Sequence, residues 1–220
     1  KTSGIETVVC VTAQHRELLD QVLEVFEITP DIDLNLMKPN QSLSQSTANI
    51  LTALTKVVTK HQPDWILAQG DTTTVMCASL VSYYHRIHFG HVEAGLRTHN
   101  KWEPFPEEIN RRIAGVTADL HFAPTEQSRQ NLINEGVKDW RIALTGNTVI
   151  DALNIIRKQP APQEALEIID NAKGDPNKKV ILMTAHRREN FGQPMKDIFT
   201  AVAELGKRFK DQITIVYTVH

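Results

Sequence analysis

A chain of 220 residues, 41% hydrophobic and 23% charged, has the composition of an ordinary globular protein and can bury a substantial core. Its net charge of −2 gives no general attraction to nucleic acid or anionic membranes, and no basic stripe interleaved with aromatic residues indicates nucleic-acid binding. No apolar run reaches the ~18 residues of a membrane-spanning helix. Cys10 and Cys77 both lie among apolar neighbours, which favours buried thiols in a reducing compartment, so we expect a cytoplasmic protein.

The first half of the chain alternates apolar strands with helices. Thr7–Ala13 is β-branched and nearly all apolar, which predicts a strand covered on both faces, and a helix follows to about Glu27. The next predicted elements are a strand at Asp33–Met37, a helix from Ser44 to about Lys60, a buried strand at Asp64–Ala68, a helix ending near His85 and a strand at His88–Glu93.

The same alternation continues to about residue 158. Pro106 suits the first position of a helix that runs to about Ala118, because its missing N–H would have no partner there. Two strands, His121–Ala123 and Asp139–Thr145, flank a helix at Thr125–Glu135 that Thr125 caps, and a last helix ends near Lys158. Strands and helices that alternate with short connections predict a doubly wound α/β fold, with parallel strands and helices on both faces.

Two Pro/Gly-rich segments, Gln159–Pro162 and Gly174–Asn177, interrupt this rhythm and enclose a helix at Glu164–Ala172. We therefore predict an N-terminal Rossmann-like domain at residues 1–158, a linker at 159–177 and the start of a second domain at 178–220. That second part contains a buried strand at Lys179–Ala185, a helix at Pro194–Phe209 and a strand at Thr214–Val219. Since two strands are too few for a finished sheet, we expect the chain to be a fragment of a longer protein.

Four predicted strands end in polar, chemically capable residues. These ends are Gln14–Arg16, Gly70–Thr74, Glu93–Arg97 and His186–Asn190. In a parallel sheet, the carboxyl ends of the strands lie along one edge, so we expect these loops to converge on one site.

Each loop also has a plain structural explanation. The turn at Gly70–Thr74 could hold an anion at a helix start, but it lacks the Walker ending, and capping by Asp71 or a threonine explains it as well. Glu107 and Glu108 could transfer protons, or could only complement the helix dipole and form surface pairs with Arg111 and Arg112.

Other chemistries fit less well. His85, His88 and His91 do not share one face of an element, which argues against a metal site. The sequence contains no Gly-x-Ser-x-Gly elbow, which argues against a serine nucleophile. The run His186–Arg188 could bind a diphosphate or could form a solvated basic turn.

Six motifs taken in order resemble one family. They are Thr-Ala-Gln-His-Arg-Glu (12–17), Gln-Gly-Asp-Thr-Thr-Thr (69–74), His-Val-Glu-Ala-Gly-Leu-Arg (91–97), Pro-Glu-Glu-x-Asn-Arg (106–111), Thr-Gly-Asn-Thr-Val-Ile-Asp (145–151) and Thr-Ala-His-Arg-Arg-Glu-Asn (184–190). Each motif is weak by itself, but six in register closely resemble the bacterial non-hydrolysing UDP-N-acetylglucosamine 2-epimerases.

This resemblance implies two Rossmann-like domains of glycosyltransferase-B type, the second one incomplete here, with the nucleotide sugar bound between them. It implies interconversion of UDP-N-acetylglucosamine and UDP-N-acetylmannosamine for surface polysaccharide synthesis, by elimination of UDP to a 2-acetamidoglucal and its re-addition. It also implies a homodimer, with no cofactor and no metal.

Matching positions imply roles for individual residues. Asp71, Glu93 and Glu107 match catalytic carboxylates, and His186 matches a histidine near the leaving diphosphate. Arg111 matches an arginine near the sugar, and we group Arg97 with it as a substrate-binding residue. A second substrate molecule, acting as an activator, would lie near Gln14, His15 and Arg187.

The chain also departs from the family pattern. The opening strand with its Gly-Thr-Arg-Pro-Glu turn and most of the second domain are absent, so we expect these 220 residues alone to bind UDP poorly and to turn over little substrate. The alternatives are a hydrolysing 2-epimerase that releases N-acetylmannosamine and UDP, a glycosyltransferase of the same fold, and a non-catalytic nucleotide-sugar-binding module.

Overall fold

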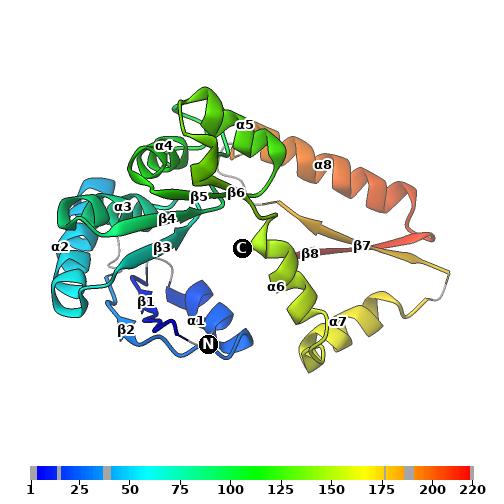
Figure 1. Ribbon diagram of the computed structural model, residues 1–220. Coiled ribbons are helices and arrows are strands. Elements are labelled where there is room, and N and C mark those ends of the chain that lie inside the picture. The colour runs from blue at the N-terminus through cyan, green and yellow to red at the C-terminus, as the bar shows by residue number, and fades with distance from the viewer. Residues whose placement is uncertain (1–3, 14–15, 37–40, 176, 186–190, 219–220) are drawn as a thin grey trace. The chain divides into compact units, whose positions relative to one another are not determined.

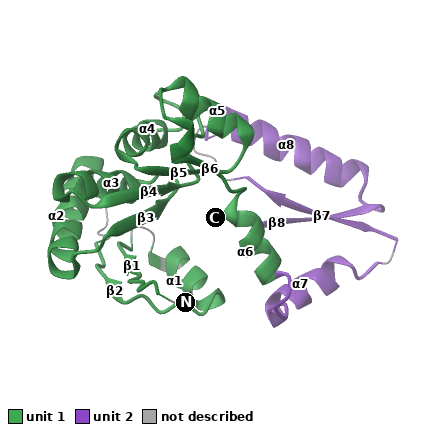
Figure 2. Cartoon of the chain, viewed as in Figure 1, with its two compact units in different colours: residues 1–156 green, residues 157–220 purple. Residues whose placement is uncertain are grey.

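The computed structural model describes residues 4–13, 16–36, 41–175, 177–185 and 191–218. The chain divides into two compact units, residues 1–156 and residues 157–220 (Figure 2). This boundary lies two residues before the predicted one and assigns the helix of the predicted linker to the second unit. None of the helices in the described ranges is both long and apolar enough to cross a membrane.

A four-stranded parallel sheet forms the centre of the first unit (Figure 1). Its strands are β3 (Trp65–Gln69), β4 (His88–Val92), β5 (Leu120–Ala123) and β6 (Ile142–Leu144), paired in that order. The helices α3 (Thr73–His85), α4 (Glu107–Thr117) and α5 (Glu126–Asn134) connect consecutive strands. Because every connection is a helix between parallel neighbours, the α/β prediction is confirmed.

The core packs on one face of this sheet. Ile66 and Ala68 of β3 point to that face, while Trp65 and Leu67 on the other face are 42% and 64% exposed. The prediction of a fully buried strand was therefore wrong, because successive side chains alternate between the two faces. The main cluster joins α2 (Leu43–His61), α3 and α4 to the sheet through Leu54, Ile66, Ala68, Val75, Ala78, Phe89, Ala114 and Ala118.

Two predicted strands near the start are shorter than expected. β1 (Cys10–Val11) and β2 (Ile32–Asp33) form a separate two-stranded parallel sheet, and α1 (Arg16–Val25) lies between them in the chain. Ala13 and Asn35 adopt positive φ angles of 55° and 43°, which end the extended backbone soon after each strand.

The end of the first unit follows the predicted order with one correction. Thr125 caps α5, since its side chain accepts a hydrogen bond from the Ser128 N–H. The segment predicted as one strand from Asp139 begins instead with the 3₁₀ turn η1 (Asp139–Arg141), in which the Arg141 N–H bonds to the Lys138 carbonyl. The last helix of this unit is α6 (Thr148–Ile156).

The second unit contains α7 (Gln163–Ala172), β7 (Lys179–Thr184), α8 (Gln193–Arg208) and β8 (Ile213–Thr218). β7 and β8 pair in parallel over six residues. The expected burial of the first of these strands is wrong, because Ile181 and Leu182 are largely exposed.

Candidate functional site

The carboxyl ends of β3 and β4 bring two of the predicted loops side by side. Gly70 follows β3 with a φ of +86°, and its N–H donates to the Val92 carbonyl at 3.0 Å. The Gln69 side-chain amide donates to the Glu93 carboxylate at 3.3 Å. A Cβ atom added at Gly70 would lie 4.0 Å from the same carboxylate, so Glu93 stands directly beside the turn that carries Asp71.

Asp71 is held by helix α4. Its carboxylate forms an ion pair with the guanidinium of Arg111, and its backbone carbonyl accepts a hydrogen bond from the Asn110 side chain at 3.0 Å. Thr72, rather than Asp71, is the N-cap of α3, because the Thr72 hydroxyl accepts from the Val75 N–H. The capping explanation of this turn therefore holds for Thr72 and leaves the Asp71 carboxylate for other contacts.

The buried imidazole of His91 binds the same turn through the Gly70 carbonyl. The Nε2 of His91 donates to the Gly70 carbonyl at 2.8 Å, and the side chain is 1% exposed. Burial lowers the pKa of His91, although the bond to the carbonyl opposes this effect. His121 is its register partner on β5, and burial lowers the pKa of His121 to about 4. Both side chains are therefore neutral near pH 7.

The loop after β4 packs against α5. Gly95 has a φ of +87°, and a Cβ atom added there would lie only 2.2 Å from the Ser128 carbonyl oxygen. The Asn131 side chain donates to the Gly95 carbonyl at 2.9 Å. This close approach requires glycine, and it fixes the path of the chain just beyond Glu93.

Arg97 lies further along this loop and is committed to contacts within the chain. Its side chain is 1% exposed, and its guanidinium donates to both carboxylate oxygens of Glu135 at 2.8 Å and to the Leu96 carbonyl at 2.7 Å. These bonds lower the pKa of Glu135. This environment differs from the substrate contact expected for Arg97, because its donors already hold the loop.

The two neighbouring glutamates of α4 have different environments. Glu107 is half-buried, and within the part of the chain that the structure describes its carboxylate makes no hydrogen bond or ion pair. Glu108 is 1% exposed and accepts from the Thr98 and His99 N–H groups at 3.1 and 3.2 Å. It also lies 3.5 Å from the Arg111 guanidinium, a pairing three residues apart.

Sequence reasoning did not identify the buried hydrogen bonds beneath these loops. Glu108 was considered for proton transfer or a surface pair, His91 only as part of a rejected metal site, and Asn110 was part of a motif without a role of its own. A signal existed for one of them: Glu108 lies three residues before Arg111, on the helical stripe that continues to the buried Ala114 and Ala118. Polar residues at the end of a core-facing stripe indicate buried hydrogen bonds.

The positions of four predicted site residues are not described by the structure. Gln14, His15, His186 and Arg187 lie outside the described residues. The histidines of the rejected metal site have separate partners, since His88 stacks on Trp65 with ring centroids 4.8 Å apart, whereas His91 bonds to Gly70.

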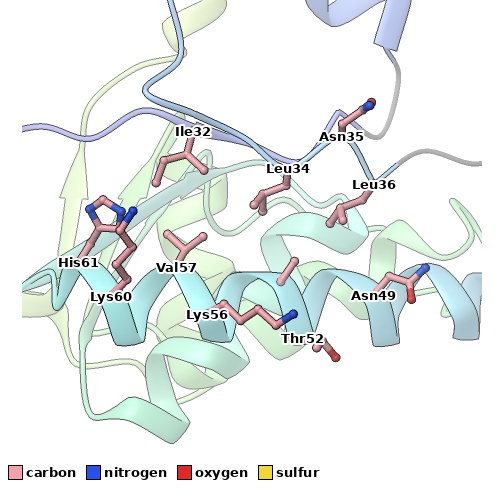
Figure 3. A pocket seen from close by; sticks show the side chains of 11 residues that line it. Ile32, Leu34, Asn35, Leu36, Asn49, Thr52, Lys56, Val57, Lys60 and His61 are labelled. Atoms are coloured by element: carbon pink, nitrogen blue, oxygen red, sulfur yellow. The ribbon is translucent and has the colours of Figure 1, made fainter.

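A cavity of about 580 Å³ lies elsewhere in the first unit, between the β2 segment and α2 (Figure 3). Ile32, Leu34 and Leu36 face Val57 and the aliphatic part of Lys56 across it. Among the predicted site residues that the structure describes, none lines this cavity. The candidate site is therefore the edge of the sheet at β3 and β4.

Comparisons with known proteins agree with the resemblance in the motifs. The family model described as UDP-N-acetylglucosamine 2-epimerase matches residues 1–220. The chain is 51% identical over 223 residues to the UDP-N-acetylglucosamine 2-epimerase of Escherichia coli K12 and 49% identical over 220 residues to that of Bacillus subtilis, in both cases over 100% of this chain. It spans 59% and 56% of these relatives, a little over half of their length.

A solved structure is similar as well. The UDP-GlcNAc 2-epimerase from Neisseria meningitidis bound to UDP-GlcNAc superposes with a TM-score of 0.89 at 47% identity, covering 99% of this chain and 60% of that one.

Proposed function

Because the chain belongs to the UDP-N-acetylglucosamine 2-epimerase family, we propose that it forms part of a non-hydrolysing enzyme that interconverts UDP-N-acetylglucosamine and UDP-N-acetylmannosamine. The observation that carries this proposal is the adjacency of Asp71 and Glu93 at the ends of neighbouring strands. Each carboxylate is held by a side chain from a neighbouring element, Asp71 by Arg111 of α4 and Glu93 by Gln69 of β3, as a site for proton transfer requires.

The chemistry explains why several carboxylates are needed. The C2 hydrogen of the sugar has no adjacent carbonyl group to acidify it, so its removal must accompany departure of a leaving group. A carboxylate takes the C2 proton while the C1–O bond to UDP breaks, which forms the C1–C2 double bond of 2-acetamidoglucal. UDP then adds back to C1, and a proton is delivered to the opposite face of C2.

We assign Asp71, Glu93 and Glu107 to proton transfer, and the half-buried Glu107 carboxylate is accessible enough for such a role. Arg111 would orient Asp71 beside the sugar, and His186 would donate to the departing diphosphate. We assign Arg97 to holding the loop that carries Glu93, because its guanidinium is already bonded to Glu135.

The same resemblance leads us to propose a cytoplasmic homodimer that serves surface polysaccharide synthesis. Gln14, His15 and Arg187 would contact a second substrate molecule that acts as an activator. Since the chain spans little more than half of its relatives, we assign the activity to the full-length protein and expect residues 1–220 alone to show little or no turnover.

Incubation of the full-length protein with UDP-N-acetylglucosamine in deuterated water tests this proposal. We expect one deuterium at C2 in both epimers, detected by NMR and mass spectrometry. Free N-acetylmannosamine with UDP would instead indicate a hydrolysing enzyme, and absence of deuterium from the sugar would indicate a binding module. Either result would exclude the proposed reaction.

Variants at the candidate carboxylates test the assignment of residues. We expect Asp71→Asn, Glu93→Gln and Glu107→Gln each to lower kcat by roughly 10²- to 10⁴-fold, the range that general acid or base catalysis contributes. A rate within about twofold of the unmodified protein would remove that residue from the proton-transfer set.

A further inference from the structure

Helix α4 opens with two adjacent glutamates that point in different directions. Successive helical residues are about 100° apart, so when one of them faces the core its neighbour turns toward the solvent. Here Glu108 faces inward and Glu107 remains half-buried at the surface. The two side chains therefore need separate explanations.

The Glu108 carboxylate is buried among donors that satisfy it. A buried ionised carboxylate is costly unless it is paired and hydrogen-bonded. Glu108 has both kinds of partner, because the Thr98 and His99 N–H groups lie at 3.1 and 3.2 Å and the Arg111 guanidinium lies at 3.5 Å. The Glu108 side chain thus connects the loop that begins at Glu93 to helix α4.

The same carboxylate is linked to the other loop of the site through Arg111. That guanidinium lies between the Glu108 and Asp71 carboxylates and pairs with both. Asn110, also buried, adds the hydrogen bond from α4 to the Asp71 carbonyl. The first two turns of α4 therefore contact the loops that follow β3 and β4.

From these contacts we propose that Glu108 is a positioning residue for the epimerisation, an inference that rests on the proposed function. It sets the distance between the Asp71 and Glu93 loops by binding the Thr98–His99 turn and Arg111 simultaneously. It does not contact the substrate. Because proton transfer depends steeply on geometry, loosening this anchor affects the reaction step more than substrate binding.

The chain offers a matched control. Glu126 also lies in the first turn of its helix, and it also pairs with an arginine three residues later, Arg129. It differs in being largely exposed and in lying outside the site. Glu126→Gln therefore removes the same charge and the same type of pair without disturbing a buried anchor.

The first test is hydrogen exchange at individual amides of the full-length protein. We expect Glu108→Gln to accelerate exchange at Thr98 and His99, because a neutral amide cannot accept from both N–H groups and from Arg111 as a carboxylate does. The Phe89 amide, bonded to the Asp119 carboxylate at the amino ends of the strands, serves as the internal reference. Unchanged exchange at Thr98 and His99 would overturn the proposal.

The second test is kinetic and uses the full-length protein. We expect Glu108→Gln to lower kcat by roughly 10- to 100-fold while KM changes less than about threefold, because a small displacement of catalytic groups carries a penalty of that order. Glu108→Asp keeps the charge on a shorter side chain and should give an intermediate kcat. Glu126→Gln should match the unmodified protein.

The outcomes separate this inference from the proposed function. If the unmodified protein incorporates no deuterium, the proposed function fails, and the exchange measurement still decides whether Glu108 anchors the turn. If epimerisation is present and Glu108→Gln has an unchanged kcat, the positioning role is wrong. Should Glu108→Gln fail to fold, unchanged kcat and amide exchange in Glu108→Asp would overturn the inference equally.

Discussion

The strands of the four-stranded sheet have similar kinds of polar residues at their amino ends and at their carboxyl ends, but in different environments. We call these two sides of the sheet the amino edge and the carboxyl edge. At the amino edge, Asp119 accepts the Phe89 N–H at 2.9 Å and lies 3.5 Å from His88 and from Arg141, but the Asp119, His88 and Arg141 side chains are 38%, 62% and 32% exposed. Water competes for each of these contacts, so each contributes little to stability.

At the carboxyl edge, several polar side chains are removed from water. Glu108, His91 and the side chain of Arg97 are each 1% exposed, and all of them are hydrogen-bonded within the chain. Removing one partner there leaves a buried group unsatisfied, which costs more than breaking an exposed pair. The comparison teaches that the carboxyl edge depends on buried contacts whose loss is costly, whereas water can replace the contacts at the amino edge.

The largest expected effect is at Gly95. In Gly95→Ala the new methyl group would meet the Ser128 carbonyl at 2.2 Å while the backbone stays at positive φ, so we expect a loss of roughly 3–5 kcal/mol in the free energy of unfolding. Gly136 has a similar φ of +90° but nothing within 4 Å of its added Cβ. Gly136→Ala should lose only about 1–2 kcal/mol in urea titrations. Equal losses would show that backbone strain, not the close contact, governs this loop.

The next effect concerns the pH dependence of stability. The pKa of His121 falls from 6.5 to about 4 on burial, so the unfolded state takes up this proton first as the pH decreases. The contribution of neutral His121 to the free energy of unfolding is complete above about pH 6.5. It decreases by roughly 3 kcal/mol as the pH falls to about 4. We expect His121→Gln to flatten this part of the profile, measured by urea unfolding at successive pH values. An unchanged slope in His121→Gln would show that burial of this side chain does not govern the pH dependence.

A smaller effect is expected for the pair between Arg97 and Glu135. Glu135→Gln removes one charge from a bidentate contact that is buried on the arginine side, so we expect a loss of about 1–3 kcal/mol at pH 7. Arg97 lowers the pKa of Glu135, so the contribution is present above the unfolded pKa of the carboxyl and disappears as the pH falls through its lower folded value. A double-mutant cycle with Arg97→Met measures the coupling. Zero coupling would contradict our assignment of Arg97 to the loop.

The smallest effect is expected at Asp119. Asp119→Asn keeps an oxygen for the Phe89 N–H and changes only half-exposed ionic contacts, so the free energy of unfolding should fall by less than about 1 kcal/mol. Chemical denaturation of this variant beside Glu108→Gln gives the most direct comparison of the two edges. A loss at Asp119 as large as the loss at Glu108 would remove the distinction.

Much of the fold could be predicted because local patterns encode it. Apolar runs and helical periodicity identified α2 to within one residue, and the threonine before α5 identified its cap. Predictions were wrong where a single residue's conformation ended a strand, as at Asn35, and where a strand faced the core on one side only, as at Leu67.

The candidate site was partly predictable for a similar reason. Polar residues after parallel strands must meet at one edge, which placed Asp71 beside Glu93. The internal contacts of Arg97 could not be predicted, because a charged side chain near a strand end has the same local pattern whether it is solvated or buried. For Glu108, the core-facing stripe of α4 indicated burial but not the partners of the carboxylate.

The amino-acid sequence by itself determined the alternation of strands and helices, the parallel arrangement that follows from it, and the order of motifs that identifies the family. These features depend on neighbours within a few residues and on connection lengths. Only the tertiary structure decided which groups the buried Glu108 carboxylate contacts, that the Arg97 guanidinium is bonded to Glu135, and that Gly95 has no room for a side chain. The physical reason is that removal from water depends on atoms brought together from distant parts of the chain, and burial decides whether a charge costs or contributes free energy.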